Sequence, residues 1–523
     1  MMRKLPIGIH TFETMITRGY LYVDKTQYVH RMATEGMYYF MARPQRFGKS
    51  LLVSTLKCLF QGRKDLFEGL WIAEHGEWEW EEHPVVVIDF NGIPSSNPKK
   101  LERSISSRLE EIATGYGVSL EPDYIELQFR DLVLALGQKT DMPVAVLIDE
   151  YDKPIIGHLG KGKEELEIAR ANRDILKSFF GVLKDTTVGT ALRFVFLTGV
   201  SQFSKVSIFS ELNNLDDISM QDDYADMLGY TQEELETCFE GYIQLLAKKL
   251  GCSENETKSE LAQRYDGYRF SERSVQVYNP FSILKAFKHK RLKDYWFETG
   301  TPTFLVNLLK EKRYDLPMVE DLEVSRSIFT TFEIDRLNPE ALLFQTGYLT
   351  IKDVDRRLYT LGYPNREVKT AFTESLLFAW TEVEEAISSH VLRLSRYLRD
   401  QDLEPFFEAV TAIFASIPYD IETKRDEAYF HTIFYLMIAA SGGKAQSSVL
   451  TSRGRIDLVV AFPDKTYIIE FKCNQSADAG VKQIKDQGYV EKYRQSGKRI
   501  ILMGINFSTE KRNLAAWKVE EVH

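Results

Sequence analysis

The sequence predicts an α/β protein with a parallel sheet in its N-terminal part, a mainly helical middle region and a second α/β part at the C-terminus. Short runs rich in Val, Ile and Phe, closed by polar or acidic residues, indicate buried parallel strands at 84–90, 143–150 and 192–199. Helical patterns lie between them, and this alternation favours a sheet with helices on both faces. From residue 425 onward strand patterns resume in RIDLVVAF, TYIIEFK and RIILMGINF.

The length of the chain predicts more than one domain. Its 523 residues exceed the roughly 250–300 residues at which a single core stops growing. The change of pattern along the chain suggests three parts: an α/β part at 1–215, a mainly helical connecting region at 216–415 and a second α/β part at 416–523. No internal repeat or low-complexity linker separates them, so we expect short connections.

Composition indicates a soluble, reduced, cytoplasmic protein. Hydrophobic residues make up 44% of the chain, enough for ordinary globular packing. No apolar run approaches the roughly 18 residues that span a bilayer, and the first residues lack a secretion signal. The four cysteines are scattered without a C-x-x-C pair, which fits neither a disulfide framework nor a zinc site. We therefore expect no membrane partner. The composition does not determine whether the protein forms an oligomer.

The charge of the chain is unevenly distributed. The net charge of −10 argues against a surface that binds nucleic acid throughout. Residues 444–512, however, hold about 13 Lys and Arg against about 7 Asp and Glu, so this stretch is basic. A polyanion such as DNA or RNA would be steered toward it. Ordinary scatter of charge is an equally good explanation at this point.

The stretch RPQRFGKSLL (43–52) has the ending of a phosphate-binding loop. The full P-loop reads G-x-x-x-x-G-K-[ST], and Arg43 stands where its first glycine is expected. A strand pattern precedes the stretch and a helical pattern follows, which is the required context. We expect Gly48 and Leu51 to offer main-chain N–H groups to ATP phosphates, Lys49 to contact the β- and γ-phosphates, and Ser50 to bind Mg²⁺.

Acidic and polar residues close the other strands of the predicted sheet. Asp149 and Glu150 end the strand VAVLID, where Asp149 would support the metal and Glu150 would orient the attacking water as a base. Thr198, followed by Ser201, ends a further strand and could contact the γ-phosphate. Ligands bind at the carboxyl edge of parallel sheets, where such residues meet. The alternative is that these are ordinary polar strand ends.

These motifs together resemble the bacterial AAA-ATPase-like family. The resemblance rests on YLYVDKTQYVHRM, RPQRFGKSL, VLIDEYDKPI and FLTGVSQFSKVSIFSELNNLDDIS, and it covers roughly the first 215 residues. The family's loop reads R-P-x-R-F-G-K-S-L, so the resemblance implies a P-loop NTPase fold and an ATP site in which Arg43 is normal and is expected to contact the cofactor. Asp24 and Lys25 also match a family signature, whereas Gln45 stands where the family often has arginine.

A second set of candidate residues lies in GRIDLVVAFPDKTYIIEFKCN (454–474). A turn at Pro463-Asp464 makes a hairpin that can bring Asp457 beside Glu470, and strand alternation puts Glu470 and Lys472 on one face. Two carboxylates can hold Mg²⁺ for phosphodiester hydrolysis, and a lysine can position water or stabilise charge. The alternative is a surface hairpin with alternating charges.

The flanking helical patterns extend this constellation into a second resemblance. Residues 420–510 resemble the PD-(D/E)XK nuclease-like domain that accompanies the AAA-ATPase-like domain, which implies a restriction-endonuclease-like α/β fold. Within that pattern Asp457, Glu470 and Lys472 match the catalytic core. Glu427 matches a helical acid that can serve as a further metal ligand, and Gln483 and Tyr489 match a supporting helix. His431 is expected to be a core histidine rather than a ligand.

The combined prediction is an ATP-binding P-loop ATPase coupled to a Mg²⁺-dependent nuclease-like domain that acts on nucleic acid. The catalytic residues would be Glu150, Asp457, Glu470 and Lys472, and the cofactors ATP and Mg²⁺. The alternative function is an ATP-dependent signalling or scaffold switch whose C-terminal domain only holds a partner, since nuclease-like folds also serve in binding.

Overall fold

A computed structural model describes the fold in residues 2–121, 123–202, 214–273, 275–296, 303–312, 314, 316–329, 334, 337–382, 388–418, 426–451 and 453–522. The chain forms two compact units. The first comprises Met1–Glu298, Thr303–Leu308 and Glu323–Asn365, and the second comprises Thr299–Pro302, Leu309–Leu322 and Arg366–His523. Among the described residues, no helix combines the length and the apolar character needed to cross a membrane.

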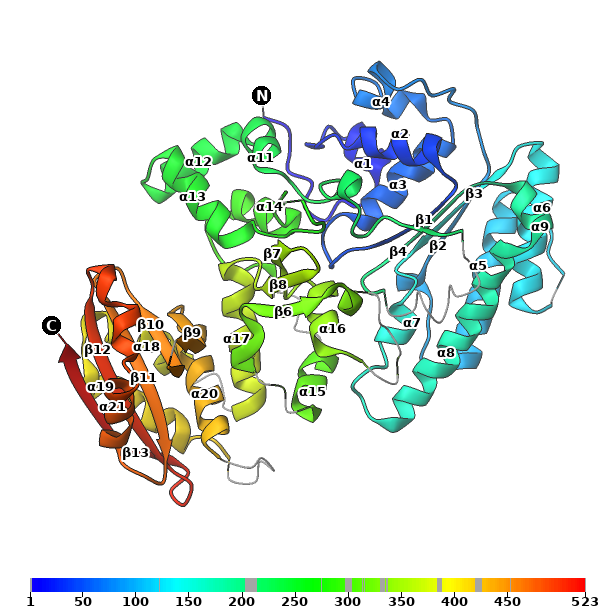
Figure 1. The fold of residues 1–523 in the computed structure, drawn as a ribbon. Helices are drawn as coiled ribbons and strands as arrows, with labels where there is room; N and C mark the ends of the chain where they lie inside the picture. The colour runs from blue at the N-terminus through cyan, green and yellow to red at the C-terminus, as the bar shows by residue number, and fades with distance from the viewer. Residues whose placement is uncertain are drawn as a thin grey trace. The chain divides into compact units, whose positions relative to one another are not determined.

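The first unit is built on a parallel five-stranded sheet (Figure 1). Its strand order is β2-β3-β4-β1-β5, with β1 (Tyr38–Ala42), β2 (Val85–Asp89), β3 (Val144–Asp149), β4 (Leu192–Gly199) and β5 (Asp216–Asp217). Every residue of β3 is buried, as its continuous apolar run predicts. Because all strands run parallel, the ends of β1, β3 and β4 meet at one edge of the sheet, with β4 between the other two.

Helices cover both faces of this sheet (Figure 1). One group contains α1 (Phe12–Thr17), α2 (Thr26–Glu35), α3 (Lys49–Phe60) and α4 (Trp71–Glu74). The other contains α5 (Pro98–Gly115), α6 (Ile125–Thr140), α7 (Lys153–Ile156), α8 (Lys163–Gly181) and α9 (Thr186–Ala191). Helix α5 starts where Asn97 accepts a hydrogen bond from the Lys100 amide and Pro98 occupies the first turn.

The rest of the first unit is mainly helical. Capping boxes start two of its helices, Thr231 with Glu234 and Ser253 with Glu256. The helices are α11 (Gln232–Cys238), α12 (Glu240–Leu250), α13 (Glu254–Tyr265), α14 (Pro280–His289) and α16 (Pro339–Gln345). Helix α15 (Thr303–Glu311) begins in this unit. A small sheet has the order β6-β8-β7, formed by β6 (Leu322–Ser325), β7 (Thr350–Asp355) and β8 (Leu358–Gly362).

The second unit contains a mixed five-stranded sheet of order β13-β12-β11-β10-β9. Its strands are β9 (Lys444–Thr451), β10 (Gly454–Ala461), β11 (Lys465–Cys473), β12 (Arg499–Ser508) and β13 (Asn513–Val522). Among the described strands of this second sheet, only β11 and β12 pair in parallel, and α21 (Ala477–Asp486) makes the crossover between them. Helix α21 packs on β11, β12 and β13.

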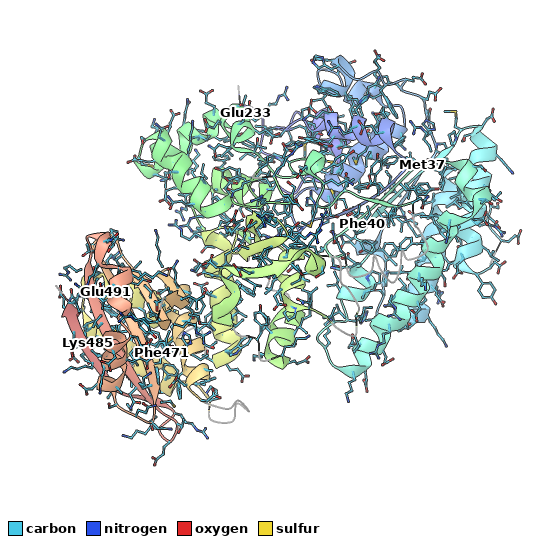
Figure 2. The ribbon with its side chains drawn as sticks, viewed as in Figure 1. Met37, Phe40, Glu233, Phe471, Lys485 and Glu491 are labelled. Carbon is cyan, nitrogen blue, oxygen red and sulfur yellow. The ribbon has the colours of Figure 1, made fainter. Side chains whose placement is uncertain are left out.

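In the part of the chain that the structure describes, the second unit also contains the α-helices α17 (Arg366–Thr381), α18 (Ser388–Asp400), α19 (Leu403–Ala415) and α20 (Glu427–Ala440). Helix α20 is buried along most of its length and packs its aromatic rings on the sheet. The Phe430 ring stacks on Phe507 at 4.6 Å, and Phe434 meets Phe471 edge-on at 5.1 Å. Phe471 is labelled in Figure 2.

The predicted fold class is confirmed: a parallel N-terminal sheet, a helical middle and a mixed C-terminal sheet. The division into parts ending at residues 215 and 415 stays a prediction. The compact units divide the middle region itself, because its chain up to Asn365 belongs mostly with the first unit and from Arg366 with the second. Residues 203–213, within the last N-terminal motif, lie outside the described residues.

Candidate functional site

The loop between β1 and α3 has the backbone shape of a phosphate-binding turn. Gly48 caps α3 with φ 98°, a conformation that favours glycine, and Arg46 also has a positive φ of 68°. A positive φ at a non-glycine residue is uncommon and clusters at functional sites. The N-terminus of α3 therefore lies beside this turn, which is the arrangement that binds anions through main-chain N–H groups.

Lys49 is buried at the base of this loop. Its side chain is 3% exposed, and its ammonium lies 3.4 Å from the Glu150 carboxylate. It also donates hydrogen bonds to the main-chain oxygens of Arg43 at 3.1 Å and Pro44 at 3.3 Å. These contacts stretch the lysine across the loop toward the end of β3. The predicted lysine and the predicted base are thus brought together.

Asp149 and Ser50 form the second pair at this edge. The Asp149 side chain is buried, and burial raises its pKa to about 6, an effect that a hydrogen bond from Ser50 opposes. The charge of Glu150 raises this pKa further. A hydroxyl and a carboxylate are hard oxygen donors, the kind that Mg²⁺ prefers. A cation here would favour the ionised carboxylate, so the donor set fits a Mg²⁺ ion.

Three acids, Asp149, Glu150 and Asp152, lie at or just after the end of β3, and their side chains have different partners. Asp149 pairs with Ser50, and Asp152 is fully buried and hydrogen-bonded to the end of β4. Glu150 has a positive φ of 51° and lines the cavity beside Lys49. Among these three acids, Glu150 alone lines this cavity. The sequence motif DEYD by itself does not distinguish Glu150 from Asp152.

Thr198 and Arg43, both expected to contact the cofactor, are occupied within the protein. The Thr198 hydroxyl donates to the Met41 carbonyl at 2.8 Å, and the residue is fully buried. The buried Arg43 guanidinium donates to the carbonyls of Ser219 and Tyr224 and lies 4.4 Å from the ring of Phe270. Their cofactor contacts stay predictions.

Arg46 anchors the other side of the loop, a role that the sequence did not indicate. Its guanidinium donates to the Trp296 carbonyl at 2.6 Å and lies 4.0 Å from the centre of the Phe281 ring. Together Arg43 and Arg46 tie the turn to residues more than 170 positions away. The arginines of the R-P-x-R pattern thus brace the loop from both sides. Gln45 between them is exposed.

A cavity of about 280 Å³ opens directly beside the loop. Gly48, Lys49, Ser50, Leu51 and Glu150 contribute to its lining. Most of the remaining lining is apolar and comes from the N-terminal segment 6–10, Tyr230 and helix α14. Ligand pockets typically combine apolar walls with a few convergent polar groups. The cavity therefore suits a ligand with an anionic end and a planar apolar end, and sequence reasoning did not find its apolar part.

The structure explains Asp24 and Lys25, which match the family signature. The Asp24 carboxylate accepts hydrogen bonds from the Thr26 amide and hydroxyl and from the Trp71 amide. Lys25 lies 2.5 Å from Glu234 and donates to the Asp226 carbonyl at 2.7 Å. Asp24 thus orders the starts of α2 and α4, and Lys25 links α2 to the helical region.

In the second unit, the hairpin of β10 and β11 brings the predicted acids together. Leu458 pairs with Ile469, so Asp457 and Glu470 are opposite at the next position. The Asp457 amide donates to the Glu470 carboxylate at 3.3 Å, and the Asp457 carboxylate accepts from the Phe471 amide at 2.9 Å. Both carboxylates therefore meet near the end of β11.

Glu470 is buried but connected to its neighbours. Its carboxylate accepts a hydrogen bond from the side-chain Nε2 of Gln483 on α21 at 2.8 Å, and the Lys472 ammonium lies 3.6 Å away. Burial, together with the charge of Asp457, raises the pKa of Glu470 to about 8, and Lys472 opposes this shift. Tyr489, also on the predicted supporting segment, donates to the Arg455 carbonyl at 3.2 Å.

Two side chains of α20 approach the same position. Burial raises the pKa of Glu427, the charge of Lys472 lowers it, and that of Asp457 raises it, so all three groups interact. His431 uses its Nε2 atom at 3.0 Å from the Asp457 carbonyl and 3.1 Å from the Ser447 hydroxyl. His431 thus contacts the main chain that carries Asp457, and its ring packs on Phe471 at 5.1 Å.

The donor set at this hairpin suits a hard cation. Within the described residues, no group of three or more His, Cys, Asp or Glu side chains is arranged to hold a metal ion. Mg²⁺, however, usually takes one or two protein carboxylates and completes its shell with water. Asp457 and Glu470 supply two carboxylates, and a cation would relieve their repulsion. The residues present therefore fit Mg²⁺.

The raised pKa of Glu470 predicts a pH-dependent stability without metal. Between the ordinary pKa of 4.5 and about 8, the folded protein keeps a proton that the unfolded chain has lost. Stability contributed by protonated Glu470 therefore falls as pH rises through this window. Glu470→Gln mimics the protonated form. In EDTA we expect the Tm of Glu470→Gln minus the Tm of wild type to be higher at pH 8 than at pH 5, by about 2 °C or more.

The matched control is Glu491→Gln, on the same unit (Figure 2). The Glu491 side chain is 65% exposed. The Tm of Glu491→Gln, measured by circular dichroism, is expected to differ from that of wild type by the same amount at pH 5 and at pH 8. A Glu470→Gln difference that does not change with pH would contradict the raised pKa.

With this geometry in hand, comparison with known proteins identifies the family. Residues 6–209 match the family described as predicted AAA-ATPase, and residues 425–517 match the PD-(D/E)XK nuclease superfamily. A relative from Azotobacter chroococcum mcd 1, described as "Uncharacterized protein in vnfD 5'region", is 38% identical over 533 residues. The alignment covers 99% of each chain.

The chain therefore belongs to the AAA-ATPase-like family and carries a C-terminal domain of the PD-(D/E)XK nuclease superfamily. The two resemblances inferred from the motifs are confirmed. Both matches lie where the motifs lie, one around the loop of Lys49 and the other around the hairpin of Asp457 and Glu470.

Proposed function

We propose that the protein binds and hydrolyses ATP at the loop of the first unit and that its C-terminal domain is a Mg²⁺-dependent nuclease. One observation carries the ATP assignment. The Lys49 ammonium, the Ser50–Asp149 pair and the Glu150 carboxylate lie beside a single cavity whose remaining lining is mostly apolar. This combination suits a nucleotide, which joins a polyanionic chain to a planar base.

Each residue of the loop has a proposed part in the reaction. Main-chain N–H groups from Gly48 to Leu51 would hold phosphate oxygens at the start of α3, and Lys49 would exchange its contact with Glu150 for the phosphates. Ser50 and Asp149 would hold Mg²⁺, which supplies charge neutralisation at the transferring phosphoryl group. Glu150, released from Lys49, would then accept a proton from the attacking water.

The ATP assignment is tested by Lys49→Ala. The substitution removes the cation that opposes the phosphates, and hydrogen bonds to charged groups contribute about 1.5–3 kcal/mol each. ATP affinity should therefore fall about 10-fold or more, measured by isothermal titration calorimetry with ATP and Mg²⁺. Turnover should fall with it.

Lys57→Ala is the matched control, because Lys57 lies exposed near the other end of the same helix α3. This variant should keep wild-type ATP affinity. Circular dichroism of both variants checks that the fold is intact. Wild-type affinity in a folded Lys49→Ala protein would end the P-loop assignment.

The nuclease proposal rests on the hairpin in the second unit. Asp457 and Glu470 would hold Mg²⁺ with Glu427 as a further ligand, and Lys472 would stabilise charge on the phosphate or position water. The basic character of residues 444–512 supports DNA or RNA as substrate. We further propose that ATP state controls cleavage, so a protein that binds ATP without hydrolysing it should cleave at an altered rate.

A further inference from the structure

Asp152 is a buried carboxylate that the proposed chemistry does not use. It directly precedes helix α7, where an aspartate usually caps its own helix, yet its side chain makes no capping hydrogen bond. It accepts instead from the Val200 amide at 3.1 Å, the Ser201 amide at 2.7 Å and the Ser201 hydroxyl at 2.6 Å. All three donors come from the chain that directly follows β4.

Burying the Asp152 carboxylate is unfavourable for the stability of the fold. Asp152 is fully buried, and burial, with the charge of Glu150, raises its pKa. An ionised group without water is strongly destabilising unless its hydrogen bonds are complete. The carboxylate also lies so close to Gly199 that a Cβ atom there would stand 2.5 Å from an Asp152 oxygen. The end of β4 is thus built around this side chain.

The segment that Asp152 holds borders the nucleotide loop. The Gly199 carbonyl accepts a hydrogen bond from the Arg43 amide at 3.2 Å, at the point where β1 enters the loop. Tyr151 adds a second link, since its hydroxyl donates to the Ser201 carbonyl at 2.7 Å while its ring meets that of Phe40 in β1 edge-on. Phe40 is labelled in Figure 2. Gln202 is held by Gln345 of α16 through a 3.1 Å hydrogen bond.

Glu150 and Asp152 are therefore parts of one turn with different partners. Glu150 faces Lys49 and the cavity, while Asp152 fixes the turn to the end of β4. A shift of the turn would move the Glu150 carboxylate relative to the loop. Misplacement of a catalytic group by about 1 Å can cost about 100-fold in rate.

We propose that Asp152 is a positioning residue that, through Ser201, holds Glu150 in place for ATP hydrolysis. The proposal rests on the proposed ATPase function and adds a residue pair to it. Asp152 does not touch the nucleotide. Its loss should therefore slow turnover and leave nucleotide binding, which depends on Lys49, nearly unchanged.

The test uses Asp152→Asn in the full chain. Asparagine keeps the volume, but it removes the charge and must place an N–H donor at one of the two oxygen positions, either at Oδ1, 3.4 Å from the Val200 amide, or at Oδ2, where the Val200 and Ser201 amides point. We expect kcat for ATP hydrolysis to fall about 10-fold or more while the Kd for ATP stays within about 2-fold of wild type. The matched control is Asp185→Asn, since Asp185 also accepts from two main-chain amides but lies exposed at the start of α9.

Ser201 provides a second variant that keeps the buried acid. Ser201→Ala removes one of the three hydrogen bonds and should lower kcat about 3-fold or more, and Ser201→Thr, which keeps the hydroxyl, should restore it. If Asp152→Asn does not fold, the comparison of Ser201→Ala with Ser201→Thr tests the proposal. An unchanged kcat in Ser201→Ala, or in folded Asp152→Asn, overturns the proposal, as does an equal loss of ATP binding. Wild-type protein without ATP turnover would instead refute the proposed ATPase function.

Discussion

Glu150→Gln is expected to lower ATP turnover about 100-fold or more while the protein still binds ATP. General base catalysis typically contributes about 100- to 10,000-fold, and glutamine cannot accept a proton from water. Asp149 and Asp152 cannot replace the base, because one pairs with Ser50 and the other with the end of β4. Binding is kept because Lys49 and the start of α3 are unchanged.

Turnover is measured by phosphate release and binding by calorimetry, each with Mg²⁺. Glu164→Gln is the control, since Glu164 lies exposed in the first turn of α8. It should behave as wild type. The same Glu150→Gln protein, loaded with ATP, tests the coupling to the nuclease: cleavage at the wild-type rate would contradict control by ATP state. Turnover within about 3-fold of wild type would mean that another group is the base.

The second large effect is expected from Asp457→Asn. The variant should lose Mg²⁺-dependent cleavage of labelled DNA and RNA, because an amide is a poorer ligand than a carboxylate for a hard cation. It should also lose the rise in Tm that Mg²⁺ causes in wild type, since a ligand that binds only the folded state stabilises it. Cleavage is followed on denaturing gels and Tm by circular dichroism.

Two variants sharpen this result. Lys472→Ala should keep the Mg²⁺-dependent rise in Tm and lose cleavage, because an ammonium does not bind a metal. Asp464→Asn is the matched control: Asp464 lies in the turn of the same hairpin with its side chain 63% exposed. A wild-type protein that neither cleaves nor gains stability with Mg²⁺ would favour the alternative in which this domain only holds a partner.

Local sequence predicted much of the candidate sites, for reasons of chain geometry. Gly48, Lys49 and Ser50 are consecutive, so a strand before them and a helix after them suffice to place them at a helix start. Asp457 and Glu470 are 13 positions apart on a hairpin with a short turn, and antiparallel pairing puts them opposite each other. Because side chains alternate between the two faces of a strand, Lys472 was also predicted to lie on the same face as Glu470.

The residues missed by sequence reasoning belong to long-range contacts. Arg46 is held by a carbonyl 250 positions away, and the apolar lining of the cavity joins segment 6–10 to helix α14. Asp152 directly precedes helix α7, but the donors to its carboxylate lie 48 and 49 positions later in the chain. No local pattern predicts such partners, because they depend on which distant segments the fold brings together; for Asp152 this is set by the position of β4 between β1 and β3.

The amino-acid sequence by itself determined the fold class, the Gly-Lys-Ser turn at the start of α3 and the acid–lysine hairpin, since propensity, periodicity and short spacings specify these features within one or two neighbouring elements. Tertiary structure alone decided which acid after β3 faces the cavity, what the two loop arginines bind and where the apolar wall comes from. The physical reason is the order of the parallel sheet. By inserting β4 between β1 and β3, it directs Asp152 to Ser201 and leaves Glu150 for Lys49.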